Sequence, residues 1–418
     1  MAYLPRIVDE ELSRRLKASG AVVVEGPKAC GKTATARQQA ASEALLDTDA
    51  RAQAALAVDP SLLLEGKTPR LLDEWQIEPS IWNHVRRAVD DRETPGQFIL
   101  TGSSVPPDDE TRHSGAGRFS RLRMRPMSLA ESGASSSEIS LAGLLDGNAT
   151  TATQTDTTLD DLIELVVRGG WPGLRQLELA DAARANRDYV DQTRRTDISA
   201  VDGVQRDPER VGAVMRSLAR HTASQATIST IARDVSGEEE RIKDHTVAAY
   251  VQSLARLMIV EDQPAWTPHL RSSHQLRTSA SRHFVDPSIA VAALGATPAS
   301  LRADLNTFGL LFESLVIRDL RIYSQRVDGQ VSHYRDSGDL EVDAIVSTYS
   351  GSWAAFEVKL GASEKILDGA AANLLRVADR VDTAQRGVPV ALGVIVGTGY
   401  GYVRPDGVHV IPIGALSP

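Results

Sequence analysis

The sequence predicts an α/β protein made of several domains, and three observations carry that prediction. The chain has 418 residues, which is more than one ordinary hydrophobic core holds, so two or three domains are expected. Its first part alternates short apolar strands with helical patterns, as a three-layer α/β domain does. Its last part returns to a long amphipathic helix followed by consecutive strands, which predicts a second domain with a mixed sheet.

Composition and charge narrow the class of protein. Hydrophobic residues make up 42% of the chain, and the net charge of −9 argues against a uniformly basic nucleic-acid-binding surface, although a local basic face stays open. The single cysteine, Cys30, excludes an internal disulfide and fits a reducing compartment. The chain begins with acidic residues where a signal peptide has an apolar run, and no segment approaches the ~18 consecutive apolar residues of a membrane helix. We therefore expect a cytoplasmic protein without membrane contact.

A glycine-bounded loop after the first apolar strand is the strongest local signal. Eight residues fit the pattern G-x-x-x-x-G-K-[ST] at every required position. They are Gly26, Pro27, Lys28, Ala29, Cys30, Gly31, Lys32 and Thr33. Glycines let backbone N–H groups curve around a polyphosphate, and the following helix adds the positive end of its dipole. We expect Lys32 to reach the β- and γ-phosphates of ATP and the Thr33 hydroxyl to bind Mg²⁺. Short patterns of this kind also arise by chance, but the flanking strand and helix supply the required context.

Two further strand ends complete a predicted hydrolytic site. A short apolar run ends in Asp73 and Glu74, where Asp73 would hold Mg²⁺ and Glu74 would polarise the water that attacks the γ-phosphate. The next strand ends in Thr101, which we expect to sense the γ-phosphate because parallel strands present their carboxyl ends to one crevice. Ser103 is the second choice for that role, and a plain strand end followed by a turn is an equal alternative.

A glycine-rich loop at 112–119 presents Arg118 as a candidate arginine finger for the transferring phosphate. Arg112 and Arg121 compete for the role, and surface arginines without any role are common. The sequence leaves open whether the finger acts within its own subunit or on a neighbour. If it acts on a neighbour, the protein must form a homo-oligomer.

Several segments of the chain are similar to one known family. They lie at 3–9, 26–33, 72–76, 100–104, 114–118 and 125–129. The chain resembles a prokaryotic AAA-type ATPase family whose C-terminal domain is of unknown function, and the resemblance covers nearly the whole chain. It implies an AAA-superfamily P-loop NTPase fold and ATP hydrolysis, and it leaves the physiological role open.

The middle of the chain is predicted to be helical and to contain a winged helix. Residues 132–158 are rich in Ser, Thr, Gly and Ala, which is linker composition. A helix at 159–167 then runs into Gly169-Gly170-Trp171-Pro172, a helix-breaking turn that resembles one in the same family. Two later helices and a strand at 258–260 follow in the order of a winged-helix unit.

A locally basic stretch after that strand is a candidate DNA contact. Residues 268–284 contain three arginines and three histidines and no acidic residue. They are Arg271, Arg277, Arg282, His269, His274 and His283. Such an excess of positive charge suits phosphate backbones, whereas winged helices also serve as packing modules and basic loops as solvated linkers.

The last part of the chain carries a second candidate site. A hairpin centred near Ser350 would place Asp343 opposite Glu357, with Lys359 on the same face of the sheet. The carboxylates would bind Mg²⁺ or Mn²⁺, and Lys359 would position or activate water. Glu313, on the preceding helix, is a further candidate ligand. Together these residues resemble the PD-(D/E)XK nuclease superfamily. Alternating acids and lysines also occur on exposed strands, and a nuclease-like fold also serves as a binding scaffold.

The predicted organisation has an ATPase domain at 1–131, a linker at 132–158, a helical and winged-helix domain at 159–285 and a nuclease-like domain at 286–418. The predicted function is ATP hydrolysis coupled to a DNA-binding or nuclease-like C-terminal module. The alternative is a nucleotide-dependent regulator or scaffold that acts on protein partners without nuclease activity. A small-molecule kinase is a weaker reading because no acceptor pocket is evident.

Overall fold

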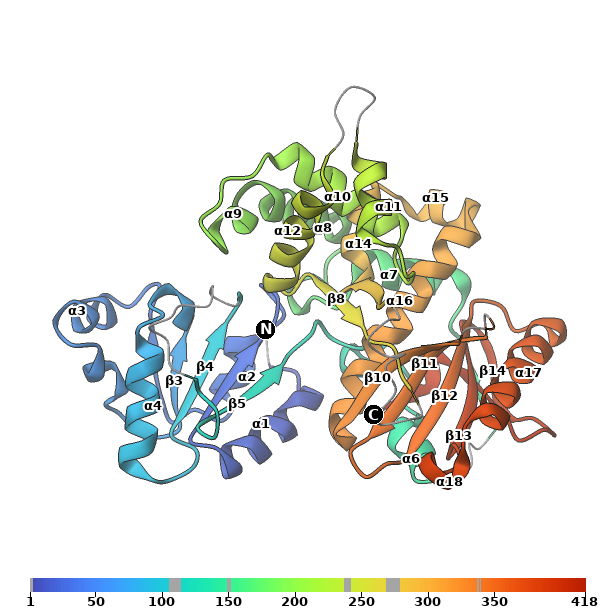
Figure 1. The fold of residues 1–418 in the computed structure, drawn as a ribbon, viewed down its shortest axis with the longest axis horizontal. Helices are drawn as coiled ribbons and strands as arrows, with labels where there is room; N and C mark the ends of the chain where they lie inside the picture. Colours follow the sequence, from blue (N-terminus) through green and yellow to red (C-terminus); the bar gives the residue numbers. More distant parts are fainter. Residues whose placement is uncertain are drawn as a thin grey trace. The chain divides into compact units, whose positions relative to one another are not determined.

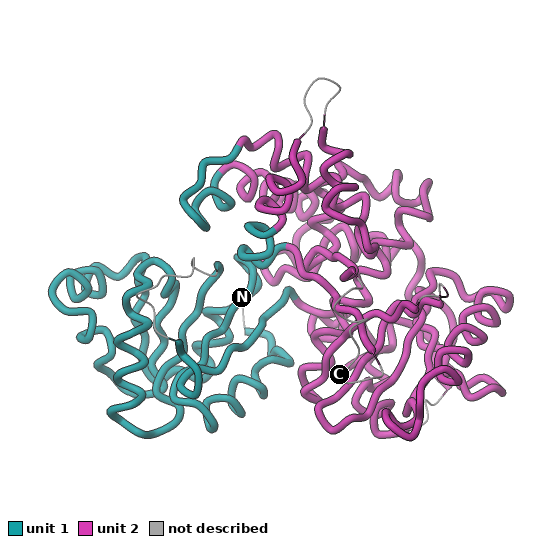
Figure 2. Tube along the Cα trace, viewed as in Figure 1, with its two compact units in different colours: residues 1–126, 196–206, 252–259 teal, residues 127–195, 207–251, 260–418 magenta. Residues whose placement is uncertain are grey.

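The computed structural model describes residues 3–104, 114–148, 152–236, 242–267, 279–336, 338 and 340–418. The chain divides into two units, which Figure 2 shows in teal and magenta. Unit 1 comprises Met1–Pro126, Thr196–Arg206 and Gln252–Ile259. Unit 2 comprises Met127–Arg195, Asp207–Val251 and Val260–Pro418.

Unit 1 is built on a five-stranded sheet in the order β2-β3-β4-β1-β5, in which all neighbouring strands are parallel (Figure 1). The strands are β1 (Ala21–Glu25), β2 (Ser42–Leu45), β3 (Arg70–Asp73), β4 (Phe98–Gly102) and β5 (Phe119–Arg123). The helices are α1 (Ile7–Ala18), α2 (Lys32–Arg37), α3 (Ala50–Val58), α4 (Ile81–Arg92) and the short 3₁₀ turns η1 (Pro60–Leu64) and η2 (Trp75–Ile77). The first four residues of β1 are completely buried, as expected for a central strand covered on both faces. The predicted parallel α/β domain is therefore present.

The second large sheet belongs to unit 2 and has seven strands in the order β10-β11-β12-β13-β15-β14-β7. The strands are β7 (Thr153–Thr155), β10 (Gly329–Arg335), β11 (Glu341–Thr348), β12 (Trp353–Lys359), β13 (Ala391–Val396), β14 (Gly399–Val403) and β15 (His409–Pro412). Strands β10, β11 and β12 pair antiparallel, and β12, β13 and β15 pair parallel, so the sheet is mixed as predicted. The helices that precede or follow its strands are α16 (Leu305–Tyr323), α17 (Glu364–Arg380) and α18 (Thr383–Arg386).

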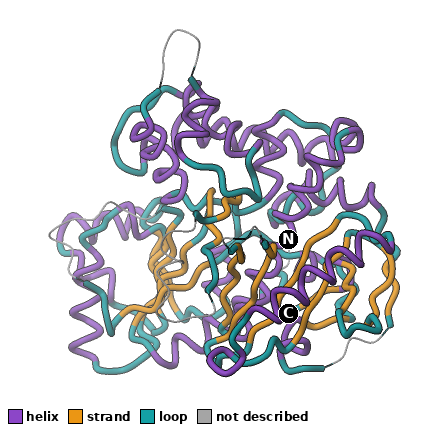
Figure 3. Tube along the Cα trace, turned by 45° about the vertical axis from the view of Figure 1, so that its right-hand side comes forward, coloured by secondary structure: helices purple, strands orange, loops and turns teal. Residues whose placement is uncertain are grey.

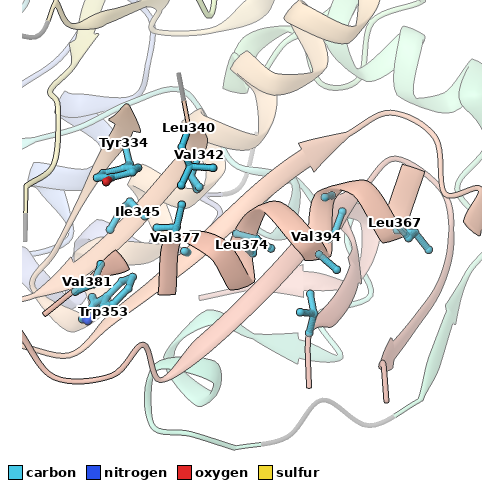
Figure 4. Packing of buried hydrophobic residues seen from close by; sticks show 14 of the residues in the cluster. Tyr334, Leu340, Val342, Ile345, Trp353, Leu367, Leu374, Val377, Val381 and Val394 are labelled. Carbon is cyan, nitrogen blue, oxygen red and sulfur yellow. The ribbon is translucent and has the colours of Figure 1, made fainter. Parts of the chain in front are cut away.

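Helix α17 covers one face of this sheet and forms its main apolar core. Leu374 and Val377 project from the helix toward Ile345, Trp353 and Val394 on the strands (Figure 4). Burying large aliphatic and aromatic side chains of this kind stabilises the fold by about 1.5–3 kcal/mol each. The core holds β11 and β12 in place, and these two strands carry the second candidate site.

The segment predicted to be a linker, 132–158, is folded into unit 2. Its strand β6 (Ile139–Ser140) pairs with β16 (Leu416–Ser417) at the end of the chain, and β7 pairs with β14. Two short helices, α5 (Leu129–Ser132) and α6 (Leu141–Leu145), lie in the same region. The Ser- and Thr-rich composition did not reveal this because the pairing partners lie far away in the sequence. The unit boundary lies at Pro126, and the middle and C-terminal regions fall into one unit rather than two.

The middle region of unit 2 is built almost entirely of helices, drawn purple in Figure 3. They are α7 (Leu159–Arg168), η3 (Pro172–Leu174), α8 (Leu179–Gln192), α10 (Pro208–Arg220), α11 (Ile228–Val235), α14 (Pro287–Leu294) and α15 (Pro298–Ala303). Helix α9 (Ile198–Ala200) belongs wholly to unit 1, whereas a π-helical turn at Thr193–Asp197 and helix α12 (Asp244–Arg256) are divided between the two units. The antiparallel pair β8 (Val260–Gln263) and β9 (Ser281–Phe284) follows α12. Ser224 also forms an isolated bridge with Arg282. The short 3₁₀ turns η5 (Ser324–Val327) and η6 (Ile413–Ala415) complete the described elements.

The basic stretch at 268–284 is only partly described. Residues 268–278, which include Arg271, Arg277, His269 and His274, lie outside the described part of the chain, as does Arg112. Of the remaining two, Arg282 pairs with Asp262 (Nε to Oδ1, 2.9 Å), and His283 is buried. Burial, together with the charge of Arg321, lowers the pKa of His283 well below its ordinary value, so this imidazole is neutral.

Among the described helices, none combines the length and the apolar character that a membrane span requires.

Candidate functional site

The glycine-bounded loop connects the end of β1 to the start of α2 in a conformation that depends on its sequence. Gly31 is the residue before α2 and has a φ of 105°, a conformation that favours glycine. Ala29 also has a positive φ, of 62°. Gly26 is required because there is no space for a side chain: a Cβ there would lie 2.3 Å from the carbonyl oxygen of Met124. Both glycines of the motif are therefore required by the fold.

A cleft of about 690 Å³ opens beside this loop, within the range of roughly 300–1,000 Å³ that small-ligand sites occupy. Its lining is mostly polar and comes entirely from unit 1. The lining residues are Lys28, Ala29, Gly31, Lys32, Thr33, Ala34, Arg37, Asp47, Glu74, Gln76, Ile77 and Ser103. The Lys32 ammonium donates to the carbonyl oxygen of Pro27 at 2.9 Å, so it lies within the loop itself.

Thr33 and Asp73 meet at the carboxyl edge of the sheet. Thr33 Oγ1 donates to Asp73 Oδ1 at 2.8 Å, which joins the start of α2 to the end of β3. Both oxygens are of the hard kind that Mg²⁺ prefers, so these two residues fit the role of holding it. Thr101, from the neighbouring strand β4, donates to the same oxygen of Asp73 and is fully buried.

Ser103, rather than Thr101, lines the cleft. Thr101 lies behind Asp73, and its hydroxyl is committed to that carboxylate. Ser103 lies two residues farther along, among the lining residues. Strand β4 ends at Gly102, so Thr101 lies within the strand, whereas Ser103 lies just beyond its end and lines the cleft.

Glu74 directs its carboxylate at the cleft. Its backbone adopts a φ of 56°, in the left-handed region that is uncommon for residues other than glycine. Its Oε2 accepts a hydrogen bond from Ser103 Oγ at 3.2 Å and another from Gln76 Nε2. These two donors orient the carboxylate. The sequence reasoning missed Gln76, and its only signal was its position two residues after Glu74.

Arg118 lies at the other edge of the sheet. Its carbonyl oxygen accepts from the N–H of Ala21, the first residue of β1, whereas the phosphate loop follows the last residue of that strand. Five residues of strand separate the two positions, about 17 Å at ~3.3 Å per residue. The Arg118 guanidinium pairs with Asp90 on α4 (Nε to Oδ1, 2.7 Å). Arg118 is therefore not brought to the cleft of its own subunit, and a role on a neighbouring subunit stays a prediction.

The predicted hairpin of β11 and β12 is present in unit 2. Ala344 pairs with Phe356, and the same register places Asp343 opposite Glu357. Lys359 Nζ lies 2.6 Å from Glu357 Oε2 and 3.2 Å from Asp343 Oδ2. Asp343 Oδ2 also accepts the backbone N–H of Val358 at 2.7 Å.

Asn373, on α17, is a member of this cluster that the sequence reasoning missed. Its amide donates to Glu357 Oε1 and to the carbonyl oxygen of Glu341. The residue carries no local signal, because only the docking of α17 on the sheet brings it to Glu357.

The pKa values of the side chains in this cluster are set by burial and by the neighbouring charges. Burial, with the charge of Asp343, raises the pKa of Glu357 to about 7. The same two causes raise the pKa of Glu313 well above its ordinary value. Although burial lowers the pKa of Lys359, the charges of Asp343 and Glu357 raise it above its ordinary value. Within the described residues, no three or more His, Cys, Asp or Glu side chains gather closely enough to hold a metal ion.

The parallel sheet, the loop and the Thr33–Asp73–Glu74 arrangement define the N-terminal region as a P-loop nucleotide-binding domain. Residues 18–133 match a family model described as an AAA domain, so this part of the chain is an AAA-type, ATPase-like domain. Residues 159–300 match a domain of unknown function, DUF8612, and residues 308–416 match another, DUF4143. No curated protein sequence matches the chain.

Solved structures resemble the chain only distantly. The Walker-type ATPase paby2304 of Pyrococcus abyssi is 14% identical, with a TM-score of 0.42 over 68% of this chain and 94% of that one. The ORC2 protein of Aeropyrum pernix, in ADPNP–ADP complexes, is 11% identical, with a TM-score of 0.32 over 72% and 92%. A DNA replication initiation factor is 14% identical, with a TM-score of 0.22 over 60% and 92%. At TM-scores this low, the likenesses carry no argument about this chain.

Proposed function

We propose that this protein hydrolyses ATP and couples the turnover to a DNA-binding or nuclease-like C-terminal module. One observation carries the first half of the proposal. Thr33, Asp73 and Glu74 converge at the carboxyl edge of one parallel sheet, beside a cleft lined by the phosphate loop. A P-loop kinase would need an acceptor pocket here, whereas a carboxylate facing the cleft suits activation of water.

In the proposed reaction the loop residues bind the triphosphate and Glu74 acts on water. The loop N–H groups and Lys32 contact the phosphates, which requires the Lys32 ammonium to leave the Pro27 carbonyl. Thr33 and Asp73 would hold Mg²⁺, which would neutralise part of the phosphate charge. Glu74 accepts a proton from the attacking water, whose oxygen bonds to the γ-phosphorus. The bond from the γ-phosphorus to the bridging oxygen breaks, and ADP and phosphate leave. Ser103 contacts the γ-phosphate and orients Glu74.

The DNA-binding part of the proposal rests on the order of elements in the middle region. Helix α10, the bridge residue Ser224, helices α11 and α12, and the pair β8–β9 follow one another as in a winged-helix unit. The sequence between β8 and β9 carries four of the basic residues noted above, Arg271, Arg277, His269 and His274. This order and this charge support contact with phosphate backbones.

The nuclease-like part of the proposal rests on Asp343, Glu357 and Lys359. Two carboxylates beside one ammonium have the chemistry of a site that would hold Mg²⁺ or Mn²⁺ and position water. Glu313 is the proposed further ligand. Within the described residues, no three acidic side chains gather as metal ligands.

A specific observation favours the alternative function, a regulator or scaffold that acts on protein partners without nuclease activity. The Lys359 ammonium contacts both carboxylates, and Asn373 completes the hydrogen bonding of Glu357. A buried cluster that is satisfied in this way is stable without a metal ion, as a purely structural site is.

One paired experiment tests the proposal: ATP turnover with and without DNA, run beside a DNA cleavage assay in Mn²⁺. We expect ATP turnover in the wild type and stimulation by DNA. Unstimulated turnover would favour the regulator. Metal-dependent cleavage that is lost in Asp343→Ala and Lys359→Ala but kept in Lys365→Ala, an exposed lysine on α17, would support the nuclease. Cleavage that persists in both site variants would remove that assignment.

A further inference from the structure

The segment before α1 carries a buried arginine with two unusual acceptors. Arg6 is 7% exposed, and its guanidinium donates from Nη1 to the carbonyl oxygen of Cys30 at 3.0 Å and from Nη2 to that of Arg125 at 2.9 Å. Asp9 fixes the backbone of Arg6 by accepting its N–H at 2.8 Å. Tyr3 holds Asp9 in turn, with its hydroxyl 2.5 Å from Asp9 Oδ1. A planar guanidinium bound at two nitrogens keeps its two acceptors in a fixed relation.

The two acceptors belong to functionally different parts of unit 1. The Cys30 carbonyl lies inside the phosphate loop, between Ala29 and Gly31, which both have positive φ angles. The Arg125 carbonyl lies in residues 124–127, the exit segment, through which the chain leaves β5 and passes into unit 2. The hydrogen bond to the Cys30 carbonyl is buried and that to the Arg125 carbonyl is partly buried, so removing Arg6 takes the guanidinium donor from both acceptors.

A second contact joins the loop to the exit segment. The N–H of Met124 donates to the carbonyl oxygen of Glu25 at 2.7 Å. The next residue, Gly26, packs so closely that a Cβ would lie 2.3 Å from the Met124 carbonyl oxygen. The beginning of the loop therefore contacts the exit segment directly, and the end of the loop contacts it through Arg6.

The far end of the exit segment is fixed inside unit 2. The N–H of Met127 donates to the carbonyl oxygen of Gly170 at 2.6 Å, and a Cβ at Gly170 would lie 2.1 Å from the Met127 carbonyl oxygen. The N–H of Gly170 donates to Asp286 Oδ2 at 2.9 Å, and Arg318 Nη1 donates to the same oxygen at 2.8 Å. Asp286 and Arg318 are both buried, so this end of the segment has little freedom to move alone.

We propose that Arg6 is a positioning residue that locks the phosphate loop to the exit segment, so that nucleotide binding is transmitted to the start of unit 2. The inference rests on the proposed ATP binding. When phosphate replaces the Pro27 carbonyl as the partner of Lys32, that carbonyl loses its hydrogen bond, and in the proposed coupling the loop readjusts between Gly26 and Cys30. Arg6 carries that readjustment to Arg125, and Met127 lies two residues farther along the chain.

Hydrogen–deuterium exchange of the full chain tests this inference, with AMP-PNP and Mg²⁺ as the probe. The readout is the nucleotide-induced change in exchange of the Met127 and Gly170 amides. In the wild type we expect a change of about threefold or more. In Arg6→Gln we expect that change to disappear at saturating nucleotide, with a dissociation constant raised by about tenfold. Arg6→Lys, which restores one donor group, should recover part of the exchange response and part of the nucleotide affinity.

Arg15→Gln is the matched control. Arg15 lies on α1, and its guanidinium binds Glu11 and Ser120 rather than the loop or the exit segment. This variant should keep the wild-type response. A response that survives in Arg6→Gln would overturn the inference, as would a wild type that binds AMP-PNP without any change at Met127. A wild type that fails to bind AMP-PNP would instead overturn the proposed function, so the two failures are distinguishable.

Discussion

Replacing Glu357 by glutamine should flatten the pH dependence of stability around β11 and β12. Glu357 is 4% exposed, and the Lys359 ammonium contacts both its carboxylate and that of Asp343. Burial, with the charge of Asp343, raises its pKa from the ordinary value of 4.5 to about 7. Glutamine removes the titrating group at nearly constant volume.

The sign and size of the effect follow from linkage. Because the pKa of Glu357 is higher in the folded state, the folded protein binds the extra proton between 4.5 and about 7. The stabilisation is fully present below 4.5 and is lost as the pH rises through about 7. At about 1.4 kcal/mol per pKa unit the full change is at most about 3 kcal/mol, so we expect an effect of about 1–3 kcal/mol. Lys359 keeps its charge across this window because its pKa is raised.

The assay is the opening free energy of the slowest amides in β11 and β12, from hydrogen exchange at about pH 5 and about pH 8. This local measure is used because a chain with two units need not unfold in two states. The loss of opening free energy from the lower to the higher pH should be smaller in Glu357→Gln than in the wild type. Glu364→Gln, an exposed glutamate at the start of α17, is the control and should behave as the wild type. Identical pH dependence in Glu357→Gln and the wild type would refute the argument.

Three further outcomes test the first unit. Glu74→Gln should keep nucleotide binding and slow ATP turnover by about 10²–10⁴-fold, as the loss of a general base does, and unchanged turnover would exclude Glu74 as the base. Asp197→Asn should tighten AMP-PNP binding by about two- to fivefold in titration calorimetry, because Asp197 lies 2.8 Å from the Lys28 ammonium and opposes an incoming anion; weaker binding would contradict this reasoning. Gly26→Ala should lower the opening free energy of β1 amides by about 1–3 kcal/mol, because its Cβ would meet the Met124 carbonyl oxygen; wild-type protection would contradict the close contact.

Local patterns were sufficient for the parts of the fold in which short segments determine geometry. The phosphate loop could be predicted because its glycines, Lys32 and Thr33 are adjacent in sequence, and the structure has the strand and helix around them. The β11–β12 hairpin could be predicted because alternation along two strands and one turn sets its register. The placement of Asp343 opposite Glu357 followed from that register alone.

Long-range packing explains what the sequence could not supply. The position of Arg118 beside Ala21 depends on β5 pairing with β1, which no local pattern indicates. Residues 132–158 have linker composition, yet their short strands pair with β14 and β16 near the end of the chain. Asn373 reaches Glu357 only because α17 docks on the sheet, and Arg6 reaches Cys30 and Arg125 only after the chain has folded.

The steady-state rate of ATP hydrolysis in the wild type and in Lys32→Ala tests the central claim most directly. Lys67→Ala, which removes an exposed lysine outside the cleft lining, is the matched control. Because Lys32 is the cation that the loop offers to the phosphates, we predict turnover in the wild type and in the control, and a loss of about a hundredfold or more in Lys32→Ala. Equal turnover in Lys32→Ala and the wild type would contradict the assignment of this loop as the ATP site.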